Sequence, residues 1–321
     1  MVEKLFNALQ AQQNHFALIV ALALVTFPYA LFVAPPTMYP VGGTIHVETG
    51  ESVGSVASRL EDMHAIHSTL AFKVFVATFG TSGIQAGSYS LSEKQNTITL
   101  AYRFSSGATG LDPIKVTIPE GSTSWDMAEI LKSTLKDFED TKFLELAKEK
   151  EGYLFPDTYF FQPGTPPDVV IRTMESAYEE RVSPLREKFA AAGKSEEEII
   201  IMASLLQKEA RKPETMKVIS GILWKRISIG MPLQVDAVFG YIHQRDTFNP
   251  SFNDLEIDSP YNTYKNKGLP PGPISNPGLD AIRAALEPTP TPYLYYLTGK
   301  DGVMRYAKTF DVHVANRAYL R

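Results

Sequence analysis

Residues 195–210, Ser195-Glu-Glu-Glu-Ile-Ile-Ile-Met-Ala-Ser-Leu-Leu-Gln-Lys-Glu-Ala210, predict a helix that carries a carboxylate at the edge of its apolar face. Ser195 and Glu198 have the spacing of a capping box, which marks the start of the helix. Apolar residues then recur at helical spacing at Ile199, Met202, Ala203, Leu206 and Ala210. At about 100° per residue, Glu209 falls at the boundary of this stripe.

Glu209 is therefore the side chain whose position needs a reason. A carboxyl group that loses hydration at such a boundary holds its proton to higher pH, which a general acid requires. The alternative is a structural glutamate that pairs with Lys208 or Arg211 on a solvated face. From helix geometry alone this alternative is the commoner case, because most helical glutamates have structural roles.

Five short motifs continue this pattern through the C-terminal half of the chain. They are EGYLFPDTY at 151–159, ASLLQKEA at 203–210, MPLQVD at 231–236, PYNTY at 260–264 and GLPPGPISNPG at 268–278. On these motifs, in this order, the chain resembles the MltG/YceG-like family of endolytic murein transglycosylases from residue 1 to the C-terminus. The resemblance implies a lyase that cuts the MurNAc–GlcNAc bond of peptidoglycan and leaves 1,6-anhydro-MurNAc ends. It implies Glu209 as acid and base, and no cofactor.

Two positions depart from the family's pattern. Gln207 stands where family members commonly carry a second glutamate, so the acid role rests on Glu209 alone. Asp236-Ala237 replaces the usual Asp-Pro, which puts the local turn in doubt and keeps the carboxylate. Neither change removes a group that the reaction needs.

The resemblance implies that several residues of these motifs bind the glycan. The predicted substrate-binding residues are Tyr159, Gln234, Asp236, Asn262 and Tyr264. Loop bracing is the alternative for the polar ones. In the aromatic-rich segment 153–161, Tyr159 is expected to stack on sugar rings, whereas Phe155 and Phe160 are expected in the core.

Two other functions remain open from the sequence. A hydrolytic muramidase generally needs two carboxylates, and Asp236 or Asp157 would supply the second if it faced Glu209 across a cleft. A lytic enzyme needs one, because the C6 hydroxyl of the same sugar attacks intramolecularly. The other alternative is a non-catalytic, membrane-tethered scaffold that binds the cell wall. Replacing Glu209 separates the scaffold from the enzymes.

Composition excludes several classes of site. The net charge of −5 gives no support for a nucleic-acid partner. The chain has no cysteine, which excludes disulfides, thiolate metal sites and a cysteine nucleophile. His64 and His67 lack a nearby third ligand, and the histidines form no HExxH pattern, so no metal site is expected.

Residues 16–34, FALIVALALVTFPYALFVA, carry no charge and, at about 1.5 Å per residue, are long enough to cross a bilayer core. They predict an uncleaved transmembrane anchor rather than a signal peptide, because bulky Phe32 lies near the end and two prolines follow Ala34. The chain has no Lys or Arg from residue 35 until Arg59, which favours translocation of the rest. The expected location is the cell (inner) membrane, single-pass, with the catalytic domain on the periplasmic side.

We expect an α+β protein of several parts. These are a cytoplasmic tail (1–15), a transmembrane anchor (16–34), a linker (35–44), a LysM-like αβ module (45–147) and a mixed α/β catalytic transglycosylase domain (148–321). Residues 45–60 and 116–131 repeat one plan of strand, glycine turn and capped helix, with Gly50 matching Gly121. This plan is typical of half a LysM-type unit, and a generic αβ spacer is the alternative.

Local patterns predict further elements. Residues 86–91 and 97–104 predict strands, and residues 293–297 and 303–307 predict a hairpin. Residues 313–316 predict a terminal helix. The proline-rich segment 268–278 predicts a rigid loop that shapes the wall of a groove. By the resemblance, the partners are peptidoglycan glycan strands and membrane-bound peptidoglycan synthases (penicillin-binding proteins), and the cut would terminate nascent strands.

Overall fold

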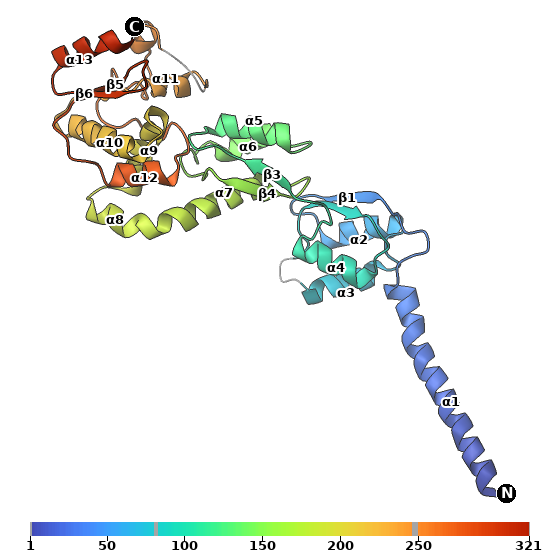
Figure 1. Ribbon diagram of the computed structural model, residues 1–321. Coiled ribbons are helices and arrows are strands. Elements are labelled where there is room, and N and C mark those ends of the chain that lie inside the picture. Colours follow the sequence, from blue (N-terminus) through green and yellow to red (C-terminus); the bar gives the residue numbers. More distant parts are fainter. Residues whose placement is uncertain (1, 80–82, 246–249, 321) are drawn as a thin grey trace. The chain divides into compact units, whose positions relative to one another are not determined.

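The computed structural model describes residues 2–79, 83–245 and 250–320, with side chains described from His15 onward. It begins with helix α1 (Val2–Pro28), which continues as a π-helix, η1 (Tyr29–Val33) (Figure 1). The segment His15–Val33 is long and apolar enough to cross a membrane, and no other helix in the described ranges is. Regular α-helical structure ends at Pro28, because a proline inside a helix lacks an N–H donor and crowds the preceding turn.

The chain divides into two compact units. The first comprises Met1–Ile114 and Gln162–Pro166, and the second comprises Lys115–Phe161 and Pro167–Arg321. The chain passes from the first unit to the second at residues 114–115, whereas the sequence predicts that the catalytic domain begins at residue 148. In the second unit, helices α5 (Ser124–Thr134) and α6 (Asp140–Ala147) pack together, and α6 packs on α7 (Pro167–Val182).

The first unit contains a strand, two helices and a strand, followed by a further helix. In chain order these are β1 (Gly43–Val47), α2 (Val53–Asp62), α3 (Thr69–Phe79), β2 (Gly87–Leu91) and α4 (Thr97–Ser106). β1 and β2 are antiparallel, with Ile45 opposite Tyr89. The Tyr89 ring stacks on Phe104 of α4 at 3.9 Å, and Phe72 of α3 meets Phe104 edge-on. The core of this unit therefore lies between the two-stranded sheet and its helices.

The predicted strand over residues 97–104 is wrong, because these residues form α4. Asn96 caps the helix by accepting a hydrogen bond from the Thr99 N–H, and Gly107 ends it in the left-handed conformation. Leu100 and Phe104 are buried one turn apart. These two caps outweigh the strand-like alternation of side chains. The predicted strand over residues 86–91 is confirmed as β2.

Residues from 114 onward repeat the order of the first unit. β3 (Ile114–Thr117), α5, α6 and β4 (Thr158–Phe161) follow one another, and β3 pairs with β4. The predicted repeat is confirmed at its turns, because Gly50 and Gly121 both adopt a left-handed conformation, with φ of +80° and +81°. Ser52 and Thr123 then cap α2 and α5.

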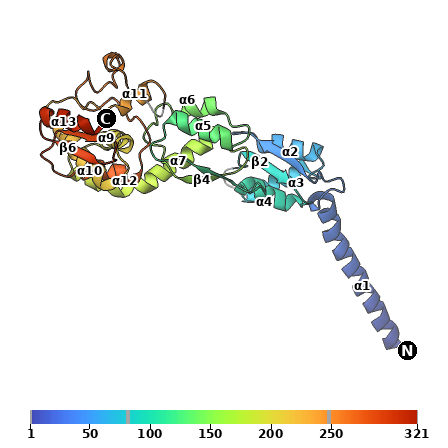
Figure 2. The same cartoon turned by 45° about the horizontal axis from the view of Figure 1, so that its top comes forward.

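The remainder of the second unit is mainly helical. Its further helices are α8 (Arg186–Ala191), α9 (Glu196–Glu209), α10 (Pro213–Ser228), α11 (Ala237–Ile242), α12 (Leu279–Leu286) and α13 (Phe310–Asn316), with short turns η2 (Ser183–Leu185), η3 (Asp254–Glu256) and η4 (Arg317–Leu320). Figures 1 and 2 both show α9, α10 and α12 side by side, and they form the core of this unit. The predicted hairpin is confirmed as antiparallel β5 (Tyr295–Thr298) and β6 (Met304–Ala307), and α13 is the predicted terminal helix.

Candidate active site

Glu209 is the last residue of α9, the central helix of the second unit. The predicted capping box is confirmed, since Ser195 Oγ accepts from the Glu198 N–H and the Glu198 carboxylate accepts from the Ser195 N–H. The predicted one-sided apolar stripe is wrong, because every residue from 199 to 206 is buried. Residues 199–206 are enclosed on all sides, whereas the first turn (196–198) and the last turn of the helix lie outside the core. Glu209 ends that last turn, and Ala210 after it is extended.

Burial and two neighbours set the protonation of Glu209. Loss of hydration raises the pKa of its carboxyl group to about 7; a hydrogen bond from Tyr296 opposes this rise, and the charge of Asp236 adds to it. Tyr296 Oη donates to Glu209 Oε2 over 2.9 Å. The C-terminus of α9 also places the negative end of the helix dipole at the carboxyl group, which disfavours its ionised form. Near neutral pH Glu209 therefore populates both protonation states.

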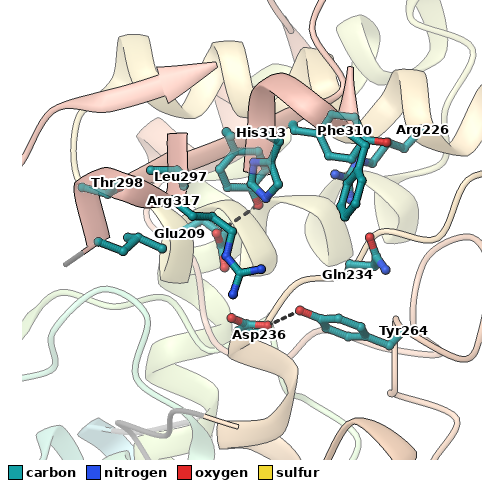
Figure 3. A pocket seen from close by; sticks show the side chains of 13 residues that line it. Glu209, Arg226, Gln234, Asp236, Tyr264, Leu297, Thr298, Phe310, His313 and Arg317 are labelled. Atoms are coloured by element: carbon teal, nitrogen blue, oxygen red, sulfur yellow. Dashed lines mark hydrogen bonds between the residues drawn. The ribbon is translucent and has the colours of Figure 1, made fainter. Parts of the chain in front are cut away.

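The Glu209 carboxyl group faces a cavity of about 370 Å³ (Figure 3). The cavity wall is formed by the ends of α9 and α10, the loop before α11, the loop that carries Tyr264, strand β5 and the C-terminal segment. Its lining residues are Glu209, Arg226, Gln234, Asp236, Tyr264, Tyr295, Tyr296, Leu297, Thr298, Phe310, His313, Arg317 and Leu320. The structure thus brings Glu209 together with three of the residues that the sequence predicts to bind substrate, Gln234, Asp236 and Tyr264.

Alternating exposure along residues 233–236 directs two polar side chains into the cavity. Leu233 and Val235 are buried in the core, whereas Gln234 and Asp236 are exposed. Thr263 fixes this register, because its carbonyl accepts from the Gln234 N–H and its hydroxyl accepts from the Val235 N–H. Gln234 has a φ of +49°, a left-handed conformation that costs a residue other than glycine about 1 kcal/mol or more. Strain of this kind is typical of residues that a binding site holds in place.

Tyr264 and Asn262, from one motif, have different surroundings. Tyr264 Oη donates to Asp236 Oδ1 over 2.5 Å. Burial and the Asp236 carboxylate raise the pKa of the Tyr264 hydroxyl well above its usual value. Asn262 is fully buried, and its amide donates to the carbonyls of Leu255 and Ile257, both at 2.9 Å. Asn262 braces the loop and does not line the cavity, which matches the bracing alternative.

Arg226, which the sequence does not single out, holds the cavity wall together. The residue is 5% exposed, and its guanidinium donates to the carbonyls of Leu294 and Leu233, each at 2.7 Å. These bonds tie α10 both to the loop that carries Gln234 and to the strand entering the hairpin. Burial lowers the pKa of Arg226, but a guanidinium stays charged at any physiological pH. An arginine in the last turn of a helix is common, so the sequence pattern does not distinguish it.

The C-terminal segment contributes side chains that the sequence also does not indicate. The rings of Phe310 and His313 lie 5.9 and 5.2 Å from that of Tyr295 on β5. Arg317, the first residue of η4, reaches the same cavity (Figure 3). Burial and the guanidinium groups of Arg226 and Arg317 lower the pKa of His313, so its ring is neutral near pH 7. No motif marks these residues, because packing between distant segments places them.

Comparison with known proteins assigns this chain to a family. The model of the YceG-like family matches residues 45–319. The chain belongs to the YceG-like family. It is 32% identical over 296 residues to a protein of Bacillus subtilis (strain 168) named endolytic murein transglycosylase, and the match covers 84% of this chain and 82% of that protein.

Two further relatives extend this likeness. A protein of Streptococcus pneumoniae serotype 2 (strain D39), also named endolytic murein transglycosylase, is 29% identical over 317 residues, covering 86% of this chain and 58% of that protein. A crystal structure of a YceG-like protein from Listeria monocytogenes matches with a TM-score of 0.60 and 29% identity. That match covers 85% of this chain and 98% of the Listeria chain.

Two motifs of this YceG-like chain meet in a buried polar network that does not line the cavity. Glu151 Oε2 accepts from the N–H and hydroxyl of Ser124, at 3.1 and 2.9 Å, and its Oε1 accepts from the amide of Asn276 at 2.6 Å. Asn276 Oδ1 in turn accepts from the Gly152 and Leu154 N–H groups, both at 2.9 Å. Burial raises the pKa of Glu151 to about 7. Glu151 is therefore a second carboxyl group with a raised pKa, and its contacts give it a structural role.

Gln207, on α9, bonds to residues next to this polar network. Its side-chain oxygen accepts from the Gly278 N–H at 3.0 Å, and its amide donates to Glu120 at 3.4 Å. Gln207 does not line the cavity, so Glu209 is the one residue of the 203–210 motif that does. The proline-rich loop 268–278 packs inward instead of forming the cavity wall, with Ile274 and Asn276 buried.

Tyr159 lies in β4 and does not reach the cavity. It is buried, and its hydroxyl donates to the Phe155 carbonyl at 2.5 Å. Phe155 is buried as predicted, whereas the prediction of a core position for Phe160 is wrong, since 65% of it is exposed. Successive side chains of a strand point to opposite faces, so Phe160 must point away from the face that buries Tyr159.

Asp236 is the second carboxylate of the cavity. Asp157, the other candidate partner of Glu209, pairs with Arg181 at 3.1 Å and does not line the cavity. Within the described ranges, no group of three or more His, Asp or Glu side chains is placed to hold a metal ion. The cavity can therefore supply a protonated carboxyl group, a carboxylate, hydroxyl and amide groups, and two guanidinium groups.

Proposed function

We propose that this chain is an endolytic peptidoglycan lytic transglycosylase in which Glu209 is both acid and base. The observation that carries the proposal is the Glu209 carboxyl group at the end of a buried helix, facing the cavity with a pKa of about 7. A group of this pKa can donate and accept a proton within one catalytic cycle near neutral pH. The names of the Bacillus and Streptococcus relatives support the same activity.

The proposed reaction consumes no water. Protonated Glu209 donates its proton to the glycosidic oxygen while the bond to the MurNAc anomeric carbon breaks, which releases a GlcNAc hydroxyl and leaves an oxocarbenium-like centre. The Glu209 carboxylate then takes the proton of the MurNAc C6 hydroxyl, and its oxygen bonds to the anomeric carbon and closes the 1,6-anhydro ring. Because the nucleophile belongs to the same sugar, it has the advantage of an intramolecular reaction. Glu209 ends the cycle protonated.

The contacts of Glu209 support this double role. The Tyr296 hydroxyl occupies Oε2, so Oε1 is the oxygen left to carry and donate the proton. Gln234, Asp236 and Tyr264 lie around the same cavity and offer amide, carboxylate and hydroxyl groups to the sugars. We propose that they orient the MurNAc ring so that its C6 hydroxyl faces Glu209.

A specific observation keeps a muramidase-type hydrolase as the second candidate. Asp236 lines the same cavity as Glu209, and a second carboxylate is what a hydrolase requires. Against this role, Asp236 already accepts a hydrogen bond from Tyr264, which orients it toward the cavity wall. The two candidates differ in their products, because hydrolysis adds one water to each cut.

The same proposal includes a location. Residues 16–34 would anchor the chain in the cell membrane, with residues 1–15 in the cytoplasm and the catalytic domain, from about residue 148, outside it. The uncovered apolar helix supports this arrangement. An enzyme held there would cut glycan strands close to the membrane-bound synthases that polymerise them and would terminate elongation.

We also propose that residues 45–147 act as a LysM-like module that contacts glycan. The order of strand, helix, helix and strand in β1, α2, α3 and β2 supports this, and β3, α5 and α6 begin a second copy, which β4 completes after residue 147. Hydrogen exchange of the Glu209→Gln protein with and without denuded glycan strands tests the idea. Protection in α2 or α5 is expected, and protection restricted to the residues of the Glu209 cavity would refute it.

The deciding experiment for the activity is the mass of fragments released from purified peptidoglycan by protein lacking residues 1–40. Ends lighter than reducing ends by one water, as in 1,6-anhydro-MurNAc, are expected. Ordinary reducing ends would favour the hydrolase. The Glu209→Gln protein is expected to bind strands and release about a thousandfold less product, as general acid–base groups typically contribute a factor of 10² to 10⁴. Unchanged cleavage by this variant would remove Glu209 from the mechanism.

A further inference from the structure

The C-terminal segment is fixed onto the hairpin that carries Tyr296. The Lys300 N–H donates to the Tyr319 carbonyl at 2.9 Å, and the Arg305 guanidinium lies 3.5 Å from the centre of the Tyr319 ring. Thr309 caps α13 at its start. These contacts hold η4 against β5 and β6, so the side chain of Arg317 enters the cavity from a fixed backbone.

The guanidinium of Arg317 is available to bind a ligand, whereas that of Arg226, the other arginine of the cavity, is not. Arg226 is buried and donates to backbone carbonyls, which uses its donors inside the protein. Arg317 is exposed, and within the described part of the chain its guanidinium makes no ion pair within 4 Å and no hydrogen bond, whereas its backbone N–H bonds to the end of α13. Figure 3 shows its guanidinium pointing into the cavity toward Glu209 and Asp236. An arginine with free donors beside two acidic groups is suited to a ligand that brings its own negative charge.

We propose that Arg317 is a specificity residue that binds a carboxylate of the glycan strand next to the bond that is cut. This inference rests on the proposed function. Each MurNAc carries a lactyl group at its C3 oxygen, which ends either in a free carboxylate or in a stem peptide that bears carboxylates. The sugars themselves are uncharged. A guanidinium matches a carboxylate with two parallel hydrogen bonds, which the neutral amide and hydroxyl groups of Gln234 and Tyr264 do not provide.

The charge distribution of the cavity supports this assignment. Asp236 repels an anion, and Glu209 does so when ionised, so a bound carboxylate requires a cation nearby. His313 does not supply one, since burial and the two guanidinium groups keep its ring neutral near pH 7. The Arg226 guanidinium is buried and donates to backbone carbonyls, so its charge is enclosed by the protein. Arg317 is therefore the cation that a substrate carboxylate can contact directly.

The test compares three substrates with the full chain. They are strands with intact stem peptides, denuded strands with free lactyl carboxylates, and denuded strands whose lactyl groups have been converted to carboxamides. Arg317→Gln is expected to raise KM about tenfold on a substrate whose carboxylate is bound, with kcat within about twofold, because a charge-assisted hydrogen bond at an exposed site is worth about this much. On the carboxamide strands the variant and the wild type are expected to have equal KM.

Two further variants make the result specific. Arg317→Lys keeps the charge without the paired donors and is expected to lie between wild type and Arg317→Gln. Arg172→Gln is the matched control, since Arg172 pairs with Asp168 on α7 and does not line the cavity. A KM effect with denuded strands identifies the lactyl carboxylate as the ligand, and an effect with peptide-bearing strands alone identifies the stem peptide. An equal loss on carboxamide strands, or a fall in kcat at constant KM, would overturn the proposal.

Strand binding separates this proposal from the proposed activity. In the Glu209→Gln background, adding Arg317→Gln is expected to raise Kd for carboxylate-bearing strands about tenfold and to leave Kd for carboxamide strands unchanged. This result would stand even if the products proved to be reducing ends. Equal Kd values with and without Arg317 would refute the carboxylate site while leaving the cleavage chemistry intact.

Discussion

The Tyr296 hydroxyl donates a hydrogen bond to Oε2 of Glu209 over 2.9 Å, which joins strand β5 of the hairpin to the last turn of α9. The bond makes the two oxygens of the carboxyl group unequal. It also favours the ionised form and so opposes the rise in pKa that burial causes. Tyr296 thereby keeps Glu209 able to act as a base after it has acted as an acid.

Tyr296→Phe is expected to shift the pH dependence of cleavage. Removing the donor takes away a contact that lowers the pKa of Glu209, so the limb of the kcat/KM profile that reports Glu209 should move to higher pH. The rate near pH 7 should fall about tenfold, because the carboxyl group loses the hydrogen bond that orients it. The profile is measured by release of fragment ends between pH 5 and 9.

Tyr306→Phe is the matched control for this experiment. Tyr306 lies on β6, stacks on Tyr293 at 5.4 Å and does not line the cavity. Its removal should leave the profile in place. Equal shifts in both variants would show that the hairpin as a whole, and not the bond to Glu209, controls the titration.

Asp236→Asn separates the two candidate reactions. In the lytic mechanism Asp236 acts on Glu209 through its charge, which raises the pKa of Glu209, so the variant should move the Glu209 limb to lower pH. Cleavage should persist within about tenfold, and all new ends should remain 1,6-anhydro. Loss of cleavage by more than about a thousandfold, together with reducing ends in the wild type, would instead assign Asp236 the second role of a hydrolase.

Features encoded by neighbouring residues could be predicted from the sequence. The capping box at Ser195 and the left-handed glycines at positions 50 and 121 depend on contacts a few residues apart, and they are confirmed. The wrong strand prediction at 97–104 also concerns local signals, because the residues that decide the structure lie at the two ends of the segment. Residues 97–104 alternate as a strand does, but the caps at Asn96 and Gly107 decide in favour of a helix.

The composition of the cavity could not be predicted in full, because it depends on packing between distant segments. The motifs identified Glu209, Gln234, Asp236 and Tyr264, which the fold brings to one cavity. They also included Asn262 and Tyr159, whose buried positions show that a motif residue can be needed for the backbone alone. The unmarked lining residues, Arg226, Tyr296, His313 and Arg317, come from a helix end, a strand and the C-terminus.

Replacing Glu209 should change how stability depends on pH. The carboxyl group has a pKa of about 7 in the folded chain and about 4.5 when unfolded, so the folded state binds its proton more tightly. Its contribution to the free energy of unfolding is complete below pH 4.5 and is lost as pH rises toward 7. Relative to wild type, Glu209→Gln should therefore gain stability with rising pH, on the order of 3 kcal/mol by pH 8.

Urea unfolding of both proteins at pH 5 and pH 8 measures this difference. Glu151 titrates in the same range and is common to both proteins, so its effect cancels. Glu214→Gln, at an exposed position on α10, is the control and should show no such trend. A stability difference independent of pH would mean that Glu209 does not take up a proton between pH 5 and 8 in the folded chain.

Asn276→Ala should destabilise the second unit without altering the chemistry of the cavity. The substitution leaves the Gly152 and Leu154 N–H groups and one oxygen of Glu151 without their partner in a buried region. Unpaired buried polar groups cost about 1–3 kcal/mol each, so a loss of about 3 kcal/mol is expected in urea unfolding. The folded fraction should retain its kcat, since none of these residues lines the cavity.

Asn266→Ala provides the comparison for that variant. Asn266 is exposed and donates to the Ser259 carbonyl at 2.9 Å, where water can replace the bond, so its loss should cost at most about 1 kcal/mol. If both variants lost equal stability, the buried network would not be the element that joins the 151–159 and 268–278 motifs. If Asn276→Ala lowered kcat in fully folded protein, the network would instead act on the position of α9 and hence on Glu209, through Gln207 and its bond to Gly278.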